Sequence, residues 1–304
     1  MGKNELLIEN IKLDFSSYYG KDLYSDGDIE NEILEIVKKA SDYDNYINES
    51  NHFEIFYHLS KEREMIVEPM DISSNDVVLE VGSGCGAITG ALAQKAKFVE
   101  CIELSKRRSM INAYKNKLHN NVIIHVGNYQ DIEISQKYDV ITLIGVLEYA
   151  GYYIQGENPH LELLQDIRTK LKTDGKLYVA IENRLGIKYL SGCKEDHFGK
   201  EFVGVEGYPM KQGIRTFSYY ELIHLFKQAG FSSFHFFYPY PDYKFPHAIY
   251  SDAYLPQKGE LKERGTNYTF QRVQTFDEIS ALNSLQMENE FKIFSNSFLV
   301  ELRN

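Results

Sequence analysis

The residues of this sequence that most clearly point to chemistry form a glycine-rich turn. Gly82, Gly84 and Gly86 follow directly after the apolar run Val77–Val81, and a helical pattern of apolar residues follows the turn. Glycines between a strand and a helix let a ligand approach the backbone closely. The spacing fits two kinds of site, because Gly82-x-Gly84-x-x-Ala87 also satisfies the dinucleotide-binding fingerprint.

Acidic residues near the turn favour one of these two interpretations. Glu80 stands two residues before the first glycine, and Glu103 closes the next apolar run. The segment Val78–Gly86 resembles the first motif of the class I S-adenosylmethionine-dependent methyltransferases, and the resemblance extends over about residues 75–240. It implies that Glu80 serves the cationic methionine end of S-adenosylmethionine and that Glu103 accepts both ribose hydroxyls.

The resemblance implies further contacts with this cofactor. Gly127-Asn128 stands where the family often has Gly-Asp near the adenine, Ile144–Tyr149 matches a strand end that faces cofactor and acceptor, and Arg63 precedes the first strand, where relatives close over the methionine carboxylate. An exposed helix face is the alternative for Arg63. The predicted cofactor-binding residues are Glu80, Gly82, Gly84, Gly86, Glu103, Leu104, Asn128, Tyr129, Gly145 and Arg63.

Hydride transfer is the competing interpretation. Tyr240 and Lys244 have the Tyr-x-x-x-Lys spacing of some NAD-dependent enzymes. Pro241 stands between them, and proline inside a helix would break the alignment that this spacing needs. We therefore expect methyl transfer instead.

Three polar segments could supply catalytic groups for methyl transfer: Glu148-Tyr149, Glu182–Arg184 and Glu195–His197. His197 is the predicted base, because imidazole titrates near neutrality and Glu195 or Asp196 could orient it. The alternative is a loop histidine with structural hydrogen bonds only. The predicted catalytic residues are His197, Glu148 and Asp196. No metal is expected, because no second histidine lies at ligand spacing and a metal would need several oxygen ligands.

Composition excludes several classes of protein. The 304 residues carry 33 Lys and Arg against 44 Asp and Glu, a net charge of −11 that disfavours a nonspecific nucleic-acid binder. No apolar run is long enough for a membrane span, and the first residues are too polar for a signal peptide. The three cysteines have no C-x-x-C spacing, which disfavours a disulfide framework or a zinc ribbon. We expect a cytoplasmic protein, monomeric or homodimeric, without membrane or nucleic-acid partners.

The elements that must position these residues alternate between strands and helices, which indicates a mostly parallel sheet. Strands are predicted at 77–81, 98–104, 122–126, 139–146, 176–181, 231–238 and 297–302. The expected fold is α/β and Rossmann-like, a seven-stranded sheet with a reversed C-terminal strand. Residues 1–70 are predicted to be an N-terminal helical cap, and residues 71–304 a class I methyltransferase domain with insertions at about 184–213 and 239–290.

The predicted activity is methylation of a small polar acceptor by S-adenosylmethionine. The segments Ile181–Arg184, Glu195–His197 and Tyr240–Lys244 also resemble those of methyltransferases associated with bacterial surface-polysaccharide glycosyltransferases, which implies O-methylation of a sugar or a similar hydroxylated molecule. The alternatives are a small-molecule methyltransferase of secondary metabolism with a nitrogen or sulfur acceptor, a nucleic-acid methyltransferase, and a noncatalytic cofactor-binding module.

Overall fold

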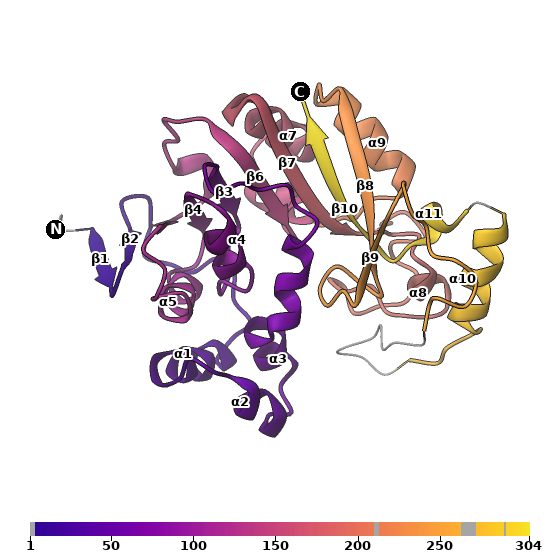
Figure 1. Cartoon of the computed structure of the whole chain (residues 1–304), viewed down its shortest axis with the longest axis horizontal. Coiled ribbons are helices and arrows are strands. Elements are labelled where there is room, and N and C mark those ends of the chain that lie inside the picture. Colours follow the sequence, from indigo (N-terminus) through magenta and orange to yellow (C-terminus); the bar gives the residue numbers. More distant parts are fainter. Residues whose placement is uncertain (1–3, 210–212, 263–271, 289) are drawn as a thin grey trace. The chain divides into compact units, whose positions relative to one another are not determined.

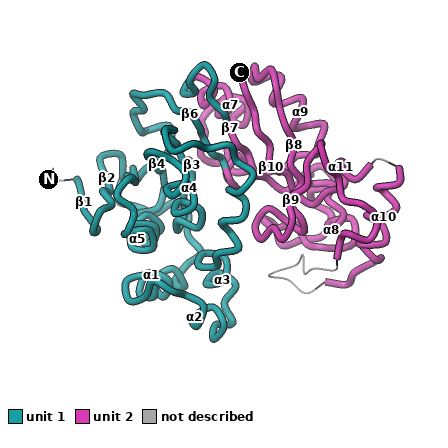
Figure 2. The backbone as a smooth tube through the Cα atoms, in the orientation of Figure 1, with its two compact units in different colours: residues 1–143, 170–176 teal, residues 144–169, 177–304 magenta. Residues whose placement is uncertain are grey.

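Strands and helices alternate along the chain in the computed structural model, which describes residues 4–209, 213–262, 272–288 and 290–304 (Figure 1). The chain divides into two units (Figure 2). Unit 1 comprises residues 1–143 and 170–176, and unit 2 comprises residues 144–169 and 177–304. The predicted boundary near residue 70 lies inside unit 1, so the division into a cap and a catalytic domain stays a prediction.

The sheet of unit 1 has the strand order β1-β2-β5-β4-β3-β6. All its pairs are parallel except β1 with β2. Four of the five residues of β3 are buried, which explains its continuous apolar run. The strands are β1 (Glu5–Ile8), β2 (Ile11–Asp14), β3 (Val77–Val81), β4 (Phe98–Glu103), β5 (Val122–Val126) and β6 (Tyr138–Ile144).

The helices of unit 1 fall into two groups. One group precedes the first parallel strand of the predicted core, and the other connects its strands. The first group is α1 (Ile29–Lys39), α2 (Asp44–Glu49), α3 (Phe53–Leu59) and the 3₁₀ helix η1 (Lys61–Val67); the second is α4 (Thr89–Lys95), α5 (Lys106–Lys115) and η2 (Tyr129–Asp131). Ser105 caps α5 by accepting a hydrogen bond from the backbone N–H of Arg108.

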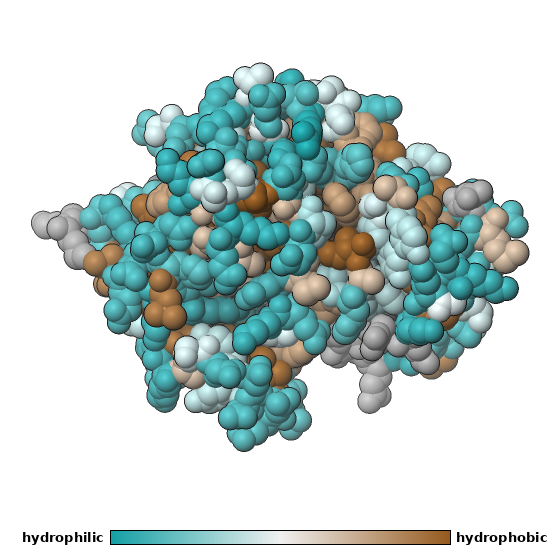
Figure 3. Space-filling model, viewed as in Figure 1, coloured by the Kyte–Doolittle hydropathy of each residue, from teal (hydrophilic) through white to brown (hydrophobic). Residues whose placement is uncertain are grey.

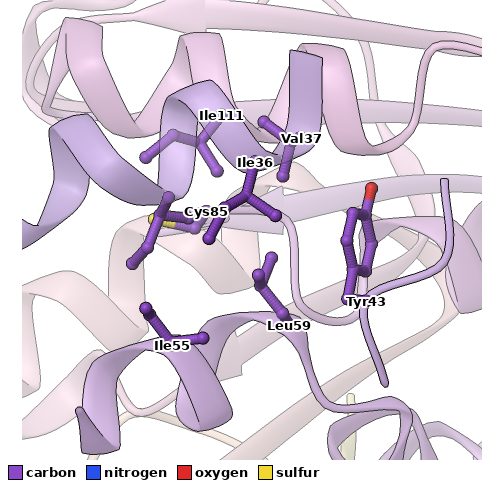
Figure 4. Close-up of a cluster of buried hydrophobic side chains, with 8 residues drawn as sticks. Ile36, Val37, Tyr43, Ile55, Leu59, Cys85 and Ile111 are labelled. Carbon is purple, nitrogen blue, oxygen red and sulfur yellow. The ribbon is translucent and has the colours of Figure 1, made fainter. Parts of the chain in front are cut away.

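The N-terminal helices pack directly onto the glycine turn (Figure 4). Ile36 of α1 and Leu59 of α3 share a buried cluster with Ile111 of α5 and with Cys85, which lies in the turn itself. Burial raises the pKa of the Cys85 thiol far above its usual value, so Cys85 is a packing residue.

Residues 5–14 are not helical, contrary to the prediction for residues 1–70. β1 and β2 form an antiparallel hairpin, and β2 continues the sheet by pairing with β5. Two strands of four residues give little periodicity, and the partner of β2 lies more than a hundred residues away along the chain, so the sequence pattern offered no clear signal.

Unit 2 contains strands in the order β7-β10-β8-β9. β10 runs antiparallel to β8, which confirms the reversed C-terminal strand, and β8 is antiparallel to β9. The strands are β7 (Leu171–Glu182), which begins in unit 1, β8 (Ser233–Tyr240), β9 (Ala248–Ser251) and β10 (Ser297–Arg303). The helices are η3 (Leu147–Tyr149), α6 (Ala150–Tyr153), α7 (Pro159–Lys170), α8 (Ile187–Leu190), α9 (Tyr219–Gln228), α10 (Glu278–Met287) and α11 (Phe291–Phe294).

The mostly parallel α/β fold is confirmed, but the predicted number of strands is wrong. The described residues form ten strands rather than seven. All seven predicted strands are present, and the additional ones are β1, β2 and β9. The predicted insertions are not free of regular structure, because α8 lies in the first, and β9 and α10 lie in the second.

The surface seen in Figure 3 is largely polar, with apolar residues scattered over it. Among the described residues, no helix is long and apolar enough to cross a membrane.

Candidate functional site

The glycine turn has the conformation that its sequence predicts. Gly84 and Gly86 have φ angles of 54° and 75°, in the left-handed region that favours glycine. A Cβ on Gly86 would lie 2.4 Å from the side-chain oxygen of Asn112 on α5, so this glycine allows close helix packing. Nothing lies within 4 Å of a Cβ built on Gly84. The turn is therefore tightly packed at Gly86 and open at Gly84, where a ligand could approach the backbone.

Glu103 lies against this open part of the turn. Its two carboxylate oxygens accept hydrogen bonds from the backbone N–H groups of Gly84 and Ser105, both at 2.8 Å. A carboxylate oxygen has more than one acceptor position, so each can still accept a hydroxyl. Burial raises the pKa of Glu103 above its usual value. The position and remaining acceptor capacity fit the two hydroxyls of a ribose.

Glu80 is buried, with one carboxylate oxygen held by neighbouring side chains. Its carboxylate accepts a hydrogen bond from the Thr89 hydroxyl at 2.6 Å and lies 3.3 Å from the Cys101 sulfur. Burial raises its pKa to about 7. These contacts lie beneath the turn and hold α4 to β3 and β4, so Glu80 stabilises the glycine turn from below.

The remaining cofactor candidates of unit 1 lie on neighbouring elements. Leu104 directly follows β4, and Asn128 and Tyr129 begin η2 after β5. Arg63 in η1 is buried, with its guanidinium group 4.2 Å from the centre of the Tyr57 ring. The alternative of an exposed helix face is therefore wrong for Arg63.

A buried ion network that the sequence did not reveal anchors the N-terminal segment of unit 1. Arg108 of α5 contacts Asp26 at 2.6 Å and Glu30 at 2.7 Å. Asp26 also contacts His58 at 2.7 Å. Burial lowers the pKa of His58 below its usual value despite this contact. The network joins α1, α3 and α5, the helices that pack around the glycine turn.

In unit 2 the structure assembles a second buried cluster, which we call the polar triad: Glu148, Glu182 and His197. Glu148 lies in η3, directly after β6; Glu182 ends β7; and His197 lies in the first predicted insertion. One carboxylate oxygen of each glutamate and one ring nitrogen of His197 lie within 4.8 Å of one another. Glu148 and His197 were predicted site residues, and Glu182 belongs to one of the three candidate segments.

Each member of the triad presents a buried polar atom without a hydrogen-bond partner among the described residues. These atoms are Glu148 Oε2, Glu182 Oε2 and His197 Nε2. His197 Nε2 lies 3.8 Å from Glu182 Oε2, too far for a hydrogen bond. Buried polar groups are nearly always bonded, so three unsatisfied atoms on residues that lie this close together indicate a position for a ligand, an ion or a water molecule.

Neighbouring side chains hold the triad from its outer side. The Tyr149 hydroxyl lies 3.1 Å from Nδ1 of His197, and the two rings meet edge to face. The Lys244 ammonium donates to Glu182 Oε1, the oxygen that is not part of the triad's convergence. Tyr240 and Lys244 were predicted not to lie on one helix, and the structure agrees, since Tyr240 is the last residue of strand β8.

Asp196 does not contact the imidazole of its sequence neighbour, contrary to one of the two predicted ways of orienting His197. Its carboxylate contacts Lys188 at 3.1 Å and Lys244 at 3.4 Å. Glu195, the other predicted partner, accepts hydrogen bonds from the backbone N–H groups of His197 and Phe198. Glu195 therefore shapes the loop, and Asp196 pairs with the lysines behind the triad.

Burial and mutual charge shift the pKa values of the triad strongly. Burial, together with the charge of Glu182, raises the pKa of Glu148 to about 8. Burial alone would lower the pKa of His197, but Glu182, Glu195 and Glu148 outweigh it and raise that pKa to about 9. Lys244 and His197 hold the pKa of Glu182 well below its usual value although burial opposes this. At neutral pH, Glu148 and His197 therefore hold protons, whereas Glu182 is charged.

Gly145, the remaining predicted cofactor residue, lies at the start of unit 2. Its φ angle is 69°, and a Cβ there would stand 2.8 Å from the Tyr243 hydroxyl and 3.6 Å from Glu148 Oε1. Tyr243 in turn donates to Glu182 at 3.3 Å. Gly145 therefore makes room for a tyrosine that contacts the triad.

Comparison with known proteins identifies the family. A family described as a methyltransferase domain matches residues 51–235, more than half of the chain. YrhH of Bacillus subtilis, described as a methyltransferase, is 29% identical over 150 residues, which are 47% of this chain and 79% of YrhH. The ribosomal RNA small subunit methyltransferase A of Syntrophus aciditrophicus is 31% identical over 96 residues, 31% of this chain and 32% of that protein.

Solved structures of methyltransferases resemble the chain more distantly. The CcbJ methyltransferase of Streptomyces caelestis is 16% identical, with a TM-score of 0.47 over 80% of this chain and 94% of CcbJ. A methyltransferase of Haloferax volcanii, solved in complex with the activator Trm112, is 15% identical, with a TM-score of 0.48 over 88% of this chain and 97% of that one. Because the family match spans the glycine turn, Glu103 and most of the parallel strands, the chain belongs to the methyltransferase domain family and takes its methyl group from S-adenosylmethionine.

Proposed function

We propose that this methyltransferase methylates a hydroxyl group of a small, polar acceptor. The observation that carries the proposal is the polar triad, in which Glu148, Glu182 and His197 lie close together and each has a buried, unsatisfied atom. An apolar acceptor would leave these atoms unsatisfied, at a cost of about 1–3 kcal/mol each. A hydroxyl both donates and accepts hydrogen bonds, and so complements such a place.

The residues around the glycine turn are proposed to hold the cofactor, which supplies an activated methyl group on a sulfonium. Glu103 accepts the ribose hydroxyls, and the backbone at Gly82, Gly84 and Gly86 lies along the bound molecule. Leu104, Asn128, Tyr129 and Gly145 contribute the further predicted contacts, and Arg63 the contact with the methionine carboxylate. Glu80 acts indirectly, since its carboxylate supports the turn.

The acceptor's oxygen attacks the methyl carbon while the carbon–sulfur bond breaks, and the electron pair of that bond stays on sulfur. The hydroxyl proton must leave, and we propose that it leaves at the triad, where Glu182 is the carboxylate that is charged at neutral pH and where Glu148 and His197, the predicted catalytic residues, hold the acceptor's oxygen. Asp196, the third, acts as a positioning residue through Lys244. Alignment and exclusion of water are the main demands of this displacement, and burial of the triad meets the second.

A sugar or similar polyhydroxylated molecule is the acceptor class that these groups favour. The surplus of acidic residues disfavours RNA, whose phosphates would be repelled. RNA is nevertheless the alternative that some relatives name, as ribosomal RNA methyltransferases, although the chain spans only about a third of the Syntrophus protein. Amines and thiols are further alternatives, because they need less help with proton removal.

The test is acceptor-dependent release of S-adenosylhomocysteine. Binding of S-adenosylmethionine is first measured by calorimetry; the purified chain is then incubated with neutral sugars and glycosides, with amines and thiols, and with ribosomal RNA. Release with hydroxylated acceptors, reduced at least tenfold in Glu148→Gln without weaker cofactor binding, is the expected result. Turnover with RNA alone, or with amines alone, would contradict the proposed acceptor. Cofactor binding with no turnover would favour the noncatalytic module.

A further inference from the structure

We infer that the polar triad is a binding site for one divalent transition-metal ion. The inference rests on the proposed function, because the ion would lie where the acceptor's oxygen is proposed to bind. The sequence predicted no metal, because no second histidine lies at ligand spacing and a metal would need several oxygen ligands. The structure supplies two such ligands, Glu148 and Glu182, from the ends of β6 and β7.

The triad has the composition and spacing of a metal site. An imidazole nitrogen and two carboxylate oxygens suit Mn²⁺, Fe²⁺, Co²⁺ or Zn²⁺, whereas Mg²⁺ and Ca²⁺ prefer oxygen ligands alone. Ligands about 2.1 Å from an ion lie about 3–4 Å apart, and the three atoms lie within 4.8 Å of one another. Movements of less than about 1 Å would complete the geometry and would leave open positions for an acceptor.

Each of the three candidate ligand residues also has a buried atom that lacks a hydrogen-bond partner among the described residues. Glu148 and Glu182 are almost completely buried, and the side chain of His197 is 8% exposed. A simple ion pair between His197 and Glu182 would bring these atoms into hydrogen-bond contact, and at 3.8 Å they stay separated, as they would around a third object.

The surrounding groups are placed as the outer contacts of metal ligands commonly are. Metal-binding histidines usually bond through their second nitrogen, and ligating carboxylates are themselves held by hydrogen bonds. Here Nδ1 of His197 faces the Tyr149 hydroxyl, and Lys244 holds the second oxygen of Glu182. Lys188 contacts Asp196 and Asp242. Lys244 contacts Glu182 at Oε1, and Glu182 Oε2 has no hydrogen-bond partner among the described residues.

An ion bound here would change the role of His197. The imidazole would be a ligand, and the open coordination positions would hold the acceptor's hydroxyl oxygen. The proton of that hydroxyl would pass to water or to a carboxylate of the network rather than to His197. The ion would therefore select acceptors that offer an oxygen, in keeping with the proposed class.

Direct binding tests the inference without any acceptor. The protein is dialysed against EDTA and titrated with Mn²⁺, and the free ion is followed by electron paramagnetic resonance. We expect one Mn²⁺ per chain and at least tenfold weaker binding in Glu148→Gln. Titration with Co²⁺ should give an absorption band that is absent in His197→Ala. Circular dichroism checks that each variant is folded; Glu148 has no ion pair among the described residues, so Glu148→Gln should fold.

The matched control is Glu100→Gln in unit 1. Glu100 and Asp14 flank His125, so this cluster also has two carboxylates and one imidazole, but there both ring nitrogens contact a carboxylate. This variant should bind Mn²⁺ as the wild type does. No saturable binding of Mn²⁺ or Co²⁺ by the wild type, or equal binding by Glu148→Gln, would overturn the inference. Methyl transfer that persists after chelation would contradict the metal site and leave the proposed function standing. Ion binding without turnover of any acceptor would support the metal site and contradict the proposed function.

Discussion

The hydroxyl of Tyr149 lies 3.1 Å from Nδ1 of His197, with the two rings nearly perpendicular. This contact fixes which ring nitrogen faces Glu148 and Glu182. Tyr149 follows Glu148 directly in the chain, so η3 supplies both a member of the triad and the group that orients another member. The contact is thus a positioning interaction, whether His197 binds an ion or takes up a proton.

Tyr149→Phe should therefore damage the triad without affecting the cofactor. The ring still packs on His197, but the hydrogen bond to Nδ1 is lost. Removing such an outer partner typically costs about 10–100-fold in metal affinity or activity. We expect a loss in this range in Mn²⁺ affinity and in kcat, measured by titration and by S-adenosylhomocysteine release. Cofactor affinity should be unchanged; a variant with wild-type values in all three measurements would show that the contact is only structural.

Glu103 offers a prediction for the cofactor site. Glu103→Gln replaces one acceptor oxygen with an amide, so it removes a backbone hydrogen bond and a proposed ribose contact together. We expect calorimetry to show at least tenfold weaker binding of S-adenosylmethionine. Because Glu103 is buried and bonded to two backbone groups, unfolding should also become easier by about 1–3 kcal/mol.

A control distinguishes the two effects of this substitution. Glu100→Gln lies on the same strand, β4, and alters a carboxylate bonded to His125 rather than to the glycine turn. It should affect stability but not cofactor affinity. Equal cofactor affinity in wild type and Glu103→Gln would reject the proposed ribose contact.

The parts of the site that the sequence predicted are those set by local pattern. An apolar run followed by glycines identifies β3 and its turn. Further apolar runs identify β4 and β6, and so the residues that directly follow these strands. Glu182 was grouped with other strand ends, but nothing in the sequence indicated that it, rather than Asp196, faces His197. That choice depends on Lys188 and Lys244, which pair with Asp196, and on Asp242, which pairs with Lys188.

The N-terminal hairpin shows the same limit for the fold. Its alternation of apolar residues is only four residues long in each strand, and the stability of β2 depends on pairing with β5. Pairings over such sequence separations are fixed by tertiary packing rather than by local propensity. The hairpin also brings Asp14 to His125, a contact between two segments more than a hundred residues apart.

His125 predicts a pH dependence of stability. Burial alone would lower its pKa, but Glu100 at 2.9 Å and Asp14 at 3.3 Å raise it above the usual value. A raised pKa means that the contribution to stability is complete below the pKa of the unfolded state, about 6.5, and is lost as the pH rises through the folded pKa. Both carboxylates have lowered pKa values, so they stay charged in weak acid.

His125→Gln should therefore destabilise the protein more at pH 6 than at pH 9, by about 1 kcal/mol or less for a partly exposed pair. Urea unfolding at the two pH values measures the difference. His247→Gln, at an exposed histidine, should show no such difference between the two pH values. A larger effect of His125→Gln at pH 9 would contradict the assigned ion contacts.

Gly145 gives the sharpest test of packing around the triad. A methyl group at this position would stand 2.8 Å from the Tyr243 hydroxyl, and the φ angle of 69° is costly for alanine. Gly145→Ala should therefore lower the free energy of unfolding by about 1–3 kcal/mol and displace Tyr243 from Glu182. The double variant Gly145→Ala, Tyr243→Phe removes the clash with the hydroxyl but keeps the backbone strain. Denaturant unfolding of both single variants and the double variant should then give a coupling of about 0.5 kcal/mol or more. Additive effects would mean that the two residues do not meet, and that the glycine serves the backbone alone.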